Sequence, residues 1–177
     1  MLLVIATSVL PCLLLLCGGV ASYPSGAYIP SGACDSMLPS PNADSGHGAA
    51  QQTGSNPFSL VLGAAKYSPG QPYNVSLIGP SHYEGFMIQA RSNTTGSRVG
   101  TWQTSTLTVL NENCSGAEGK ALVHKATLEG TGNMTFTWTA PPAGTGYVKF
   151  YATVVQEKEV FWAKFPGPML VGEDPCP

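Results

Sequence analysis

Charged side chains are scarce in this sequence. Asp, Glu, Lys and Arg together make up 10% of its 177 residues, and eight basic residues stand against ten acidic ones, which gives a formal net charge of −2. No run of Lys or Arg occurs. Proteins that bind nucleic acids or sulfated polysaccharides carry clusters of basic residues. The sequence lacks that electrostatic footprint, so we expect no contact with nucleic acid.

Only one long apolar stretch is present, and it lies at the amino terminus. Residues 2–9 and 13–16 are largely apolar, Pro11 and Cys12 interrupt them, and residues 19–21 are small. This order is typical of a signal peptide over residues 1–21, and Pro11 argues against a membrane anchor. No later stretch approaches the about 20 apolar residues that span a bilayer. We therefore expect a secreted, extracellular protein without a membrane span in its mature chain.

Catalytic and metal-binding patterns are also missing. The sequence has no Gly-x-Ser-x-Gly nucleophile motif, and its acidic residues are scattered, so nothing favours a carboxylate pair for glycoside hydrolysis. His47, His82 and His124 do not have metal-ligand spacing, and we expect His124 to pack within a strand. The sequence predicts no catalytic residue, no metal site and no cofactor. It favours a binding protein over an enzyme.

Three cysteines remain beyond the expected signal peptide: Cys34, Cys114 and Cys176. In an oxidising compartment an odd number leaves one pair and one unpaired thiol. A bridge from Cys34 to Cys114 would close a loop of about 80 residues, and Cys176, between two prolines near the end of the chain, is the natural unpaired residue. Cys176 is then a candidate for a disulfide-linked dimer.

Asn-x-Ser/Thr acceptors for N-glycosylation agree with secretion. Asn93 lies in a polar run, and Asn74 and Asn133 fall on the polar side of expected strands. Asn113 is a poorer acceptor because Cys114 occupies the middle of its motif. We expect glycans on Asn74, Asn93 and Asn133.

Short segments with a period of two, separated by Gly and Pro turns, fill the chain after residue 57. Gly and Pro number 21 and 15, and no stretch is convincing as an amphipathic helix. Six to nine strands at such intervals predict an all-β antiparallel sandwich. Residues 23–57 lack periodicity and are expected to form an irregular segment that lies against the sheets. The expected strands are residues 58–64, 73–77, 85–91, 99–102, 107–110, 121–128, 134–138, 147–155 and 160–165.

Residues 85–91 are the clearest strand. Phe86, Ile88 and Ala90 fall on one side of the alternation, and the other side ends in Arg91, one of two arginines in the chain. Arg91 is a candidate contact for a phosphate or carboxylate, the alternative being a salt bridge or a hydrogen bond to a loop carbonyl. Tyr83, in the preceding turn, is a candidate exposed contact.

The three tryptophans have two interpretations. Trp102, Trp138 and Trp162 would suit a platform for carbohydrate or lipid, but Trp138 and Trp162 lie in alternating strands. We therefore expect both to pack in the core.

Taken in order, these segments resemble a reeler domain, the module at the amino terminus of reelin and of spondins. The resemblance covers almost the whole mature chain and places the domain at residues 22–170, between the signal peptide and a short tail over residues 171–177. The matching pieces are Tyr23-Pro24-Ser25-Gly26-Ala27, Cys34 with Met37 and Pro39, Pro57-Phe58-Ser59-Leu60, Tyr67-Ser68-Pro69-Gly70, residues 85–91, Gly100-Thr101-Trp102, Cys114, His124, Trp138 with Ala140-Pro141, Thr153-Val154-Val155-Gln156 and Phe161-Trp162.

The resemblance implies an immunoglobulin-like β-sandwich with a long amino-terminal segment and a disulfide between Cys34 and Cys114. Some members have a second bridge, but Tyr147 stands where one of its cysteines would be. A signal peptide followed by one reeler domain resembles the insect defence proteins. This implies a role in innate, antibacterial defence through recognition of a microbial surface component or of an extracellular partner protein. Two alternatives are an extracellular-matrix or receptor-interaction module and the amino-terminal part of a ferric-chelate-reductase-like membrane protein.

Overall fold

The computed structural model describes residues 29–40, 47–48, 52, 54–80, 82–114, 120–126, 128 and 132–173. Within them strands are the main regular structure, beside one turn of α-helix and one 3-10 turn. The elements are α1 (Ala33–Ser36), β1 (Ser59–Leu62), β2 (Lys66–Tyr67), β3 (Pro72–Ile78), β4 (Gly85–Ser92), β5 (Thr101–Trp102), β6 (Thr108–Leu110), η2 (Glu112–Cys114), β7 (Leu122–His124), β8 (Met134–Thr139), β9 (Tyr147–Glu157) and β10 (Val160–Gly172).

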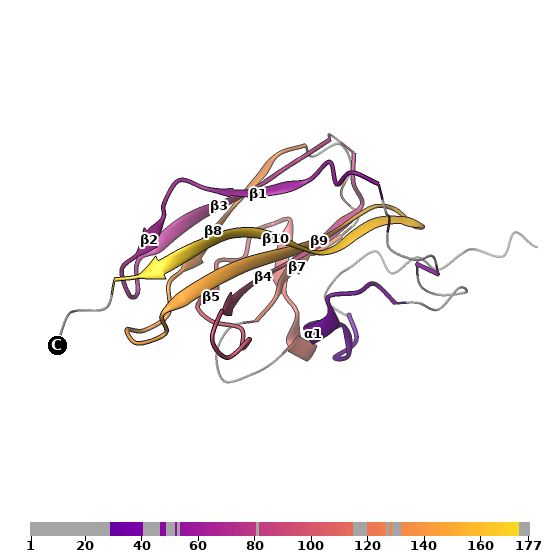
Figure 1. Ribbon diagram of the computed structural model, residues 1–177. Coiled ribbons are helices and arrows are strands. Elements are labelled where there is room, and N and C mark those ends of the chain that lie inside the picture. Colours follow the sequence, from indigo (N-terminus) through magenta and orange to yellow (C-terminus); the bar gives the residue numbers. More distant parts are fainter. Residues whose placement is uncertain are drawn as a thin grey trace, which may run out of the picture.

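Two sheets make up the fold, which confirms the predicted β-sandwich. The four-stranded sheet has the order β1-β3-β8-β5, and the six-stranded sheet has the order β2-β10-β9-β4-β7-β6. The strands pair antiparallel, apart from β2, which runs parallel to β10. In Figure 1, β1 and β3 lie on one side of β9 and β10, and α1 lies on the far side, below β4 and β7.

The main core lies between the sheets and follows the alternation of the strands. In β8, Phe136 and Trp138 are buried, and the threonines at positions 135, 137 and 139 alternate with them on the more exposed side. The Trp138 ring lies edge-on to Phe150 with ring centroids 5.0 Å apart, and its Nε1 donates to the carbonyl of Val99. Buried residues of both sheets complete this core: Val75, Leu77, Phe86, Ile88, Ala90, Val148, Ala152, Val154 and Leu170.

Some strand limits differ from those expected. β7 ends at His124 rather than near residue 128, and the short strand β2 had no sequence signal. β10 continues to Gly172, beyond the domain end expected at residue 170, because Val171 pairs with Tyr147 and Lys66. Apolar periodicity therefore locates strands well, but edge pairings lengthen or shorten them.

A third layer covers the outer face of β4, as expected of the amino-terminal segment. All eight residues of β4 are buried, although its alternation predicted only one apolar face. Residues 29–40, which we call the covering segment, place Cys34 and Met37 against Met87 and Val123 in a second apolar cluster. The polar side of β4 is thus enclosed.

Candidate functional site

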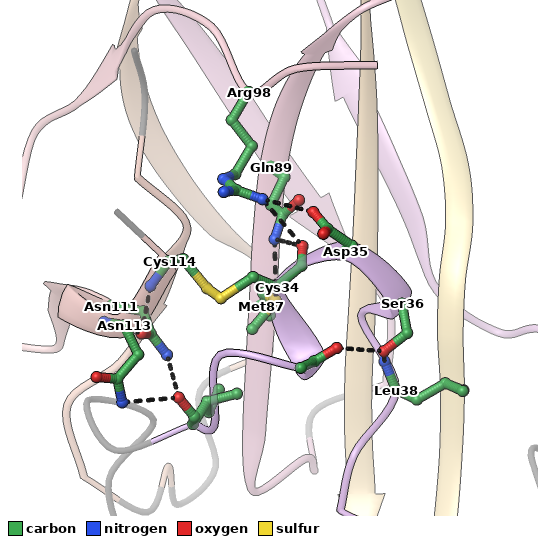
Figure 2. The surroundings of a disulfide bond; sticks show 12 residues. Cys34, Asp35, Ser36, Leu38, Met87, Gln89, Arg98, Asn111, Asn113 and Cys114 are labelled. Atoms are coloured by element: carbon green, nitrogen blue, oxygen red, sulfur yellow. Dashed lines mark hydrogen bonds and ion pairs between the residues drawn. A yellow bond between two sulfur atoms is a disulfide. The ribbon is translucent and has the colours of Figure 1, made fainter. Parts of the chain in front are cut away.

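A disulfide ties the covering segment to the sheet. Cys34 and Cys114 are bonded, with their Cα atoms 5.2 Å apart and 80 positions apart in the sequence. Figure 2 shows Met87 and Gln89 of β4 beside this bridge. Asn111 and Asn113 donate from their side-chain amides to the carbonyl of Ile29, at 3.4 and 3.1 Å. The disulfide and these hydrogen bonds therefore hold the covering segment and the 3-10 turn at Cys114 together on the outer side of β4.

Arg91 and Gln89 hold the carbonyl end of α1. Arg91 Nη2 donates to the carbonyl oxygens of Cys34 (2.7 Å) and Asp35 (3.1 Å), and Gln89 Nε2 donates to the same Cys34 oxygen at 2.9 Å. Arg91 Nε donates to Gln89 Oε1 at 2.9 Å. The alternative foreseen for Arg91 was a salt bridge or a hydrogen bond to a loop carbonyl. The structure instead shows Nη2 bonded to backbone carbonyls of helix α1 and Nε bonded to a side chain.

Three more side chains from the sheet side bind the covering segment. Arg98 Nη1 lies 3.0 Å from Asp35 Oδ1, Lys164 Nζ donates to the Asp35 carbonyl at 2.9 Å, and Thr153 Oγ1 donates to the Met37 carbonyl at 2.6 Å. The bonds from Lys164 and Thr153 satisfy backbone carbonyls at the end of a helix of one turn, and the Arg98 contact is an ion pair. Cationic side chains thus gather beside the covering segment.

A β-bulge brings Lys164 to this place. Between Trp162 and Phe165 of β10 one extra residue opposes β9, and Lys164 takes a left-handed conformation with φ 47°. Its backbone N–H donates to Thr153 Oγ1 at 2.9 Å. Bulges re-aim side chains, and non-glycine residues in this conformation concentrate at functional sites.

A cleft of about 190 Å³ opens beside the covering segment, where residues of β4, β9 and the β10 bulge meet the turn after β4. We call it the cationic cleft; it is lined by Arg91, Ser92, Asn93, Gly96, Lys149, Tyr151 and Lys164. Three of the chain's eight basic residues line it, and none of the lining residues is acidic. The cleft is therefore a local positive region on a chain of net negative charge.

Two of these cations face each other directly. Arg91 of β4 and Lys149 of β9 are register partners, so their side chains project from the same face of the sheet. Like charges in this arrangement are destabilising. Burial, and then the charge of Arg98, lower the pKa of Arg91, while Asp35 and Tyr151 raise it. The site therefore carries positive charge that the described residues do not fully compensate.

A turn at residues 92–97 forms the rim of the cleft. Ser92 N–H donates to the Ser97 carbonyl at 2.8 Å, Gly96 N–H donates to the Ser92 carbonyl at 2.9 Å, and Asn93 N–H donates to the Tyr147 carbonyl at 2.8 Å. The rim is thus fixed to β9.

The prediction of Tyr83 as an exposed contact is wrong. Tyr83 is fully buried, with its ring against Phe58 and its hydroxyl donating to the Gly132 carbonyl at 2.9 Å. Turn residues before β4 suggested exposure, but the aromatic ring fills the end of the core. Trp138 is in the core as expected, and Trp162 is half-buried and packs against it.

His124 packs within β7, as expected. Its Nδ1 lies 3.1 Å from the backbone nitrogen of Phe86, and its ring covers Gly85. Burial lowers the pKa of His124, and a hydrogen bond to the Phe86 backbone opposes this shift.

The three expected glycan acceptors are exposed: Asn74 on β3, Asn93 on the cleft rim and Asn133 before β8. Asn133 Oδ1 also accepts from the Gly79 backbone N–H at 3.2 Å. Cys176 lies outside the described residues, as does the expected signal peptide.

Sequence reasoning found Arg91 but missed Lys149, Tyr151 and Lys164. Tyr151 and Lys149 are alternate residues on β9, so the register of β9 against β4 could have placed them beside Arg91 had that pairing been known. The bulge that positions Lys164 left no signal in the sequence.

Comparisons with known proteins agree on one family. Residues 32–175 match the Reeler domain family. The human F-spondin reeler domain has the same architecture, with a TM-score of 0.58 and 28% identity, covering 71% of this chain and 95% of that one.

Relatives fall into two groups. "Ferric-chelate reductase 1" of Bos taurus is 31% identical over 85% of this chain, but the chain spans only 24% of that protein. "Putative defense protein Hdd11-like" of Samia ricini is 30% identical over 80% of this chain and 83% of its own length. In the described part of the chain, no helix is long and apolar enough to cross a membrane.

Proposed function

Because this chain belongs to the reeler domain family, we propose that it is a secreted, extracellular binding protein of the defence type. In this proposal the chain recognises a component of microbial surfaces. The cationic cleft is the contact site. The role is one of binding, without an enzymatic step.

The extent of the matches supports the defence role over the others. The Samia ricini protein is matched over 83% of its length, whereas the reductase of Bos taurus is matched over 24%. The similarity to the reductases therefore concerns their reeler part, and it carries no argument for a reductase reaction in this chain.

The observation that carries the proposed site is the unpaired charge in the cleft. Arg91 and Lys149 oppose each other across β4 and β9, and Lys164 joins them at the same opening. Although charged residues are few in this protein, three cationic side chains lie together in the cationic cleft. Surface fields of this kind attract anionic ligands and raise their association rates.

Binding of the purified chain to bacteria and to isolated cell-wall polymers tests this proposal. We expect saturable binding to at least one anionic polymer, weakened by the variant Lys149→Met and by added salt. The variant Lys125→Met is the matched control, because it removes the same charge from an exposed loop after β7. Absence of binding to cells and to every polymer would refute the proposal.

A second candidate rests on the reductase relatives, which match 85% of this chain. The described domain would then be the amino-terminal module of a larger membrane protein. Sequencing the transcript past residue 177 distinguishes the two: a stop codon supports the defence protein, and continued membrane-spanning sequence supports the reductase-like protein. Retention on heparin at physiological salt would instead favour a matrix-interaction module.

A further inference from the structure

We propose that the cationic cleft is a binding site for a single phosphoryl group. Its biological setting rests on the proposed function, but the site itself follows from the side chains that line the cleft. The ligand would be a phosphate monoester carried by a surface polymer or by a lipid headgroup.

Several donors of the cleft are unused within the described residues. Arg91 Nη1, Lys149 Nζ and Tyr151 Oη make no hydrogen bond there, whereas the other Arg91 nitrogens are held by Gln89 and α1. Lys164 Nζ uses one of its three protons on the Asp35 carbonyl. The bound half of Arg91 fixes its guanidinium, so the free nitrogen is already oriented before a ligand arrives.

The charge of the cleft fits a phosphoryl group better than a carboxylate. A carboxylate brings one negative charge and two oxygens to three cations. A phosphate monoester brings a charge of about −1.5 to −2 and three strong acceptor oxygens. Such a group can accept from Arg91, Lys149 and Lys164 at once, and it would relieve the repulsion between the opposed Arg91 and Lys149.

The size of the cleft limits the ligand to one charged group. Its volume of about 190 Å³ lies below the range of about 300–1,000 Å³ typical of pockets for whole drug-sized molecules. The net charge of −2 also opposes binding along an extended polyanion. A long polymer would therefore be held through one phosphate at a time.

Titration of the full chain with inorganic phosphate and with acetate, at equal ionic strength, tests the site. The backbone amide resonances of Ser92, Asn93 and Gly96 report binding at the rim. We expect saturable shifts with phosphate and an affinity for acetate at least about tenfold weaker, since fewer charge-assisted hydrogen bonds form. Equal affinities, or no saturable shift with phosphate, would overturn the proposal.

Variants locate the binding. Lys149→Met should weaken phosphate binding by about fivefold to tenfold, and Tyr151→Phe, which keeps the ring, should weaken it by a smaller factor. Lys149→Arg should retain binding within about threefold, and Lys125→Met should not change it. Equal losses of phosphate affinity in Lys149→Met and Lys125→Met would show that binding depends only on the net charge of the protein. That result would refute a specific phosphoryl site in the cleft.

Two further binding experiments identify the molecule that carries the phosphoryl group. They also separate the phosphoryl site from the proposed function. One uses a soluble polysaccharide that bears phosphate monoester groups, and the other uses phosphatidylcholine vesicles with and without phosphatidic acid, a lipid with a phosphate monoester headgroup. Competition by inorganic phosphate in either experiment supports the phosphoryl site and names its source. Phosphate binding without binding to any microbial polymer would refute the proposed function alone. Polymer binding that neither phosphate nor Lys149→Met reduces would refute the phosphoryl site alone.

Discussion

Arg91 Nη2 donates a 2.7 Å hydrogen bond to the carbonyl oxygen of Cys34, which lies 57 residues earlier in the chain. The same guanidinium lines the cationic cleft through its position at the end of β4. One side chain therefore belongs both to the attachment of the covering segment and to the candidate binding site. The stability of the covering segment and the affinity of the cleft should depend on each other.

The variant Arg91→Met should lower the free energy of unfolding by about 1–3 kcal/mol, because it leaves the fully buried Gln89 Oε1 without its donor. Arg91→Lys should recover only part of this loss, since an ammonium cannot reproduce the planar guanidinium contacts. Urea denaturation measures the free energy of unfolding of both variants, and Lys125→Met serves as the control. A loss in Arg91→Met no larger than in the control would contradict the assigned role.

Removal of the disulfide in the double variant Cys34→Ala/Cys114→Ala should lower stability by about 3–5 kcal/mol, because the bridge closes a loop of 80 residues. Amide hydrogen exchange should show the largest loss of protection over residues 33–37 and in the outer cluster around Met87. If protection fell equally in β3 and β8, the bridge would stabilise the sandwich as a whole rather than the covering segment.

Gly85 has no room for a side chain. A Cβ there would lie 2.5 Å from Cε1 of His124. We expect Gly85→Ala to destabilise the fold by about 1–3 kcal/mol through overpacking. The cost should be smaller when measured in a His124→Ala background, and this coupling is read from a double-mutant cycle. Gly63→Ala is the control, because its Cβ would meet nothing within 4 Å. If the effects of Gly85→Ala and His124→Ala on the free energy of unfolding were additive, a clash between the added methyl group at position 85 and the His124 ring would be excluded as the cause.

The stability of the protein should fall in acid partly through His124. Burial lowers its folded pKa below the ordinary value of 6.5. The unfolded chain then binds more protons, so the stability given by neutral His124 is complete above the unfolded pKa and is lost as the pH falls toward the folded pKa. As the pH falls through the ordinary histidine range, His124→Asn should lose less free energy of unfolding than the natural protein does. Identical slopes for His124→Asn and the natural protein would disprove the effect.

A glycan on Asn93 should limit access to the cleft, because Asn93 lines its rim. We expect enzymatic removal of the glycans to strengthen binding of a polysaccharide that bears phosphate monoesters, while leaving the binding of inorganic phosphate almost unaffected. Mass spectrometry establishes occupancy, and the Asn74→Gln variant serves as the control on β3. Stronger polymer binding after loss of the Asn74 glycan alone would point to a different contact surface.

The sequence was sufficient for the sandwich because alternation is a local property. Phe136 and Trp138 face the core as their spacing indicates, and residues 85–92 form the expected strand. Local pattern could not show that the second face of β4 is enclosed, since that depends on where residues 29–40 lie. The alternation alone therefore could not show that Gln89 and Arg91 are buried.

The candidate site was less accessible to sequence reasoning for a related reason. Arg91 was identified from its rarity, but its partners come from β9 and from a bulge in β10. Sheet order and register bring these residues together, and neither can be read from one strand. Tyr83 shows the reverse error: its turn context suggested exposure, whereas long-range packing buries it.

The position of the bridge also bears on the order in which the protein is made. Cys34 and Cys114 both precede β8, β9 and β10 in the chain. During synthesis the crosslink can therefore close while β4 still lacks β9, the neighbour with which it pairs from Gly85 to Ser92. The later strands must then complete a sheet whose outer cover is already attached. In biosynthesis the outermost layer of this molecule can be the first to be fixed.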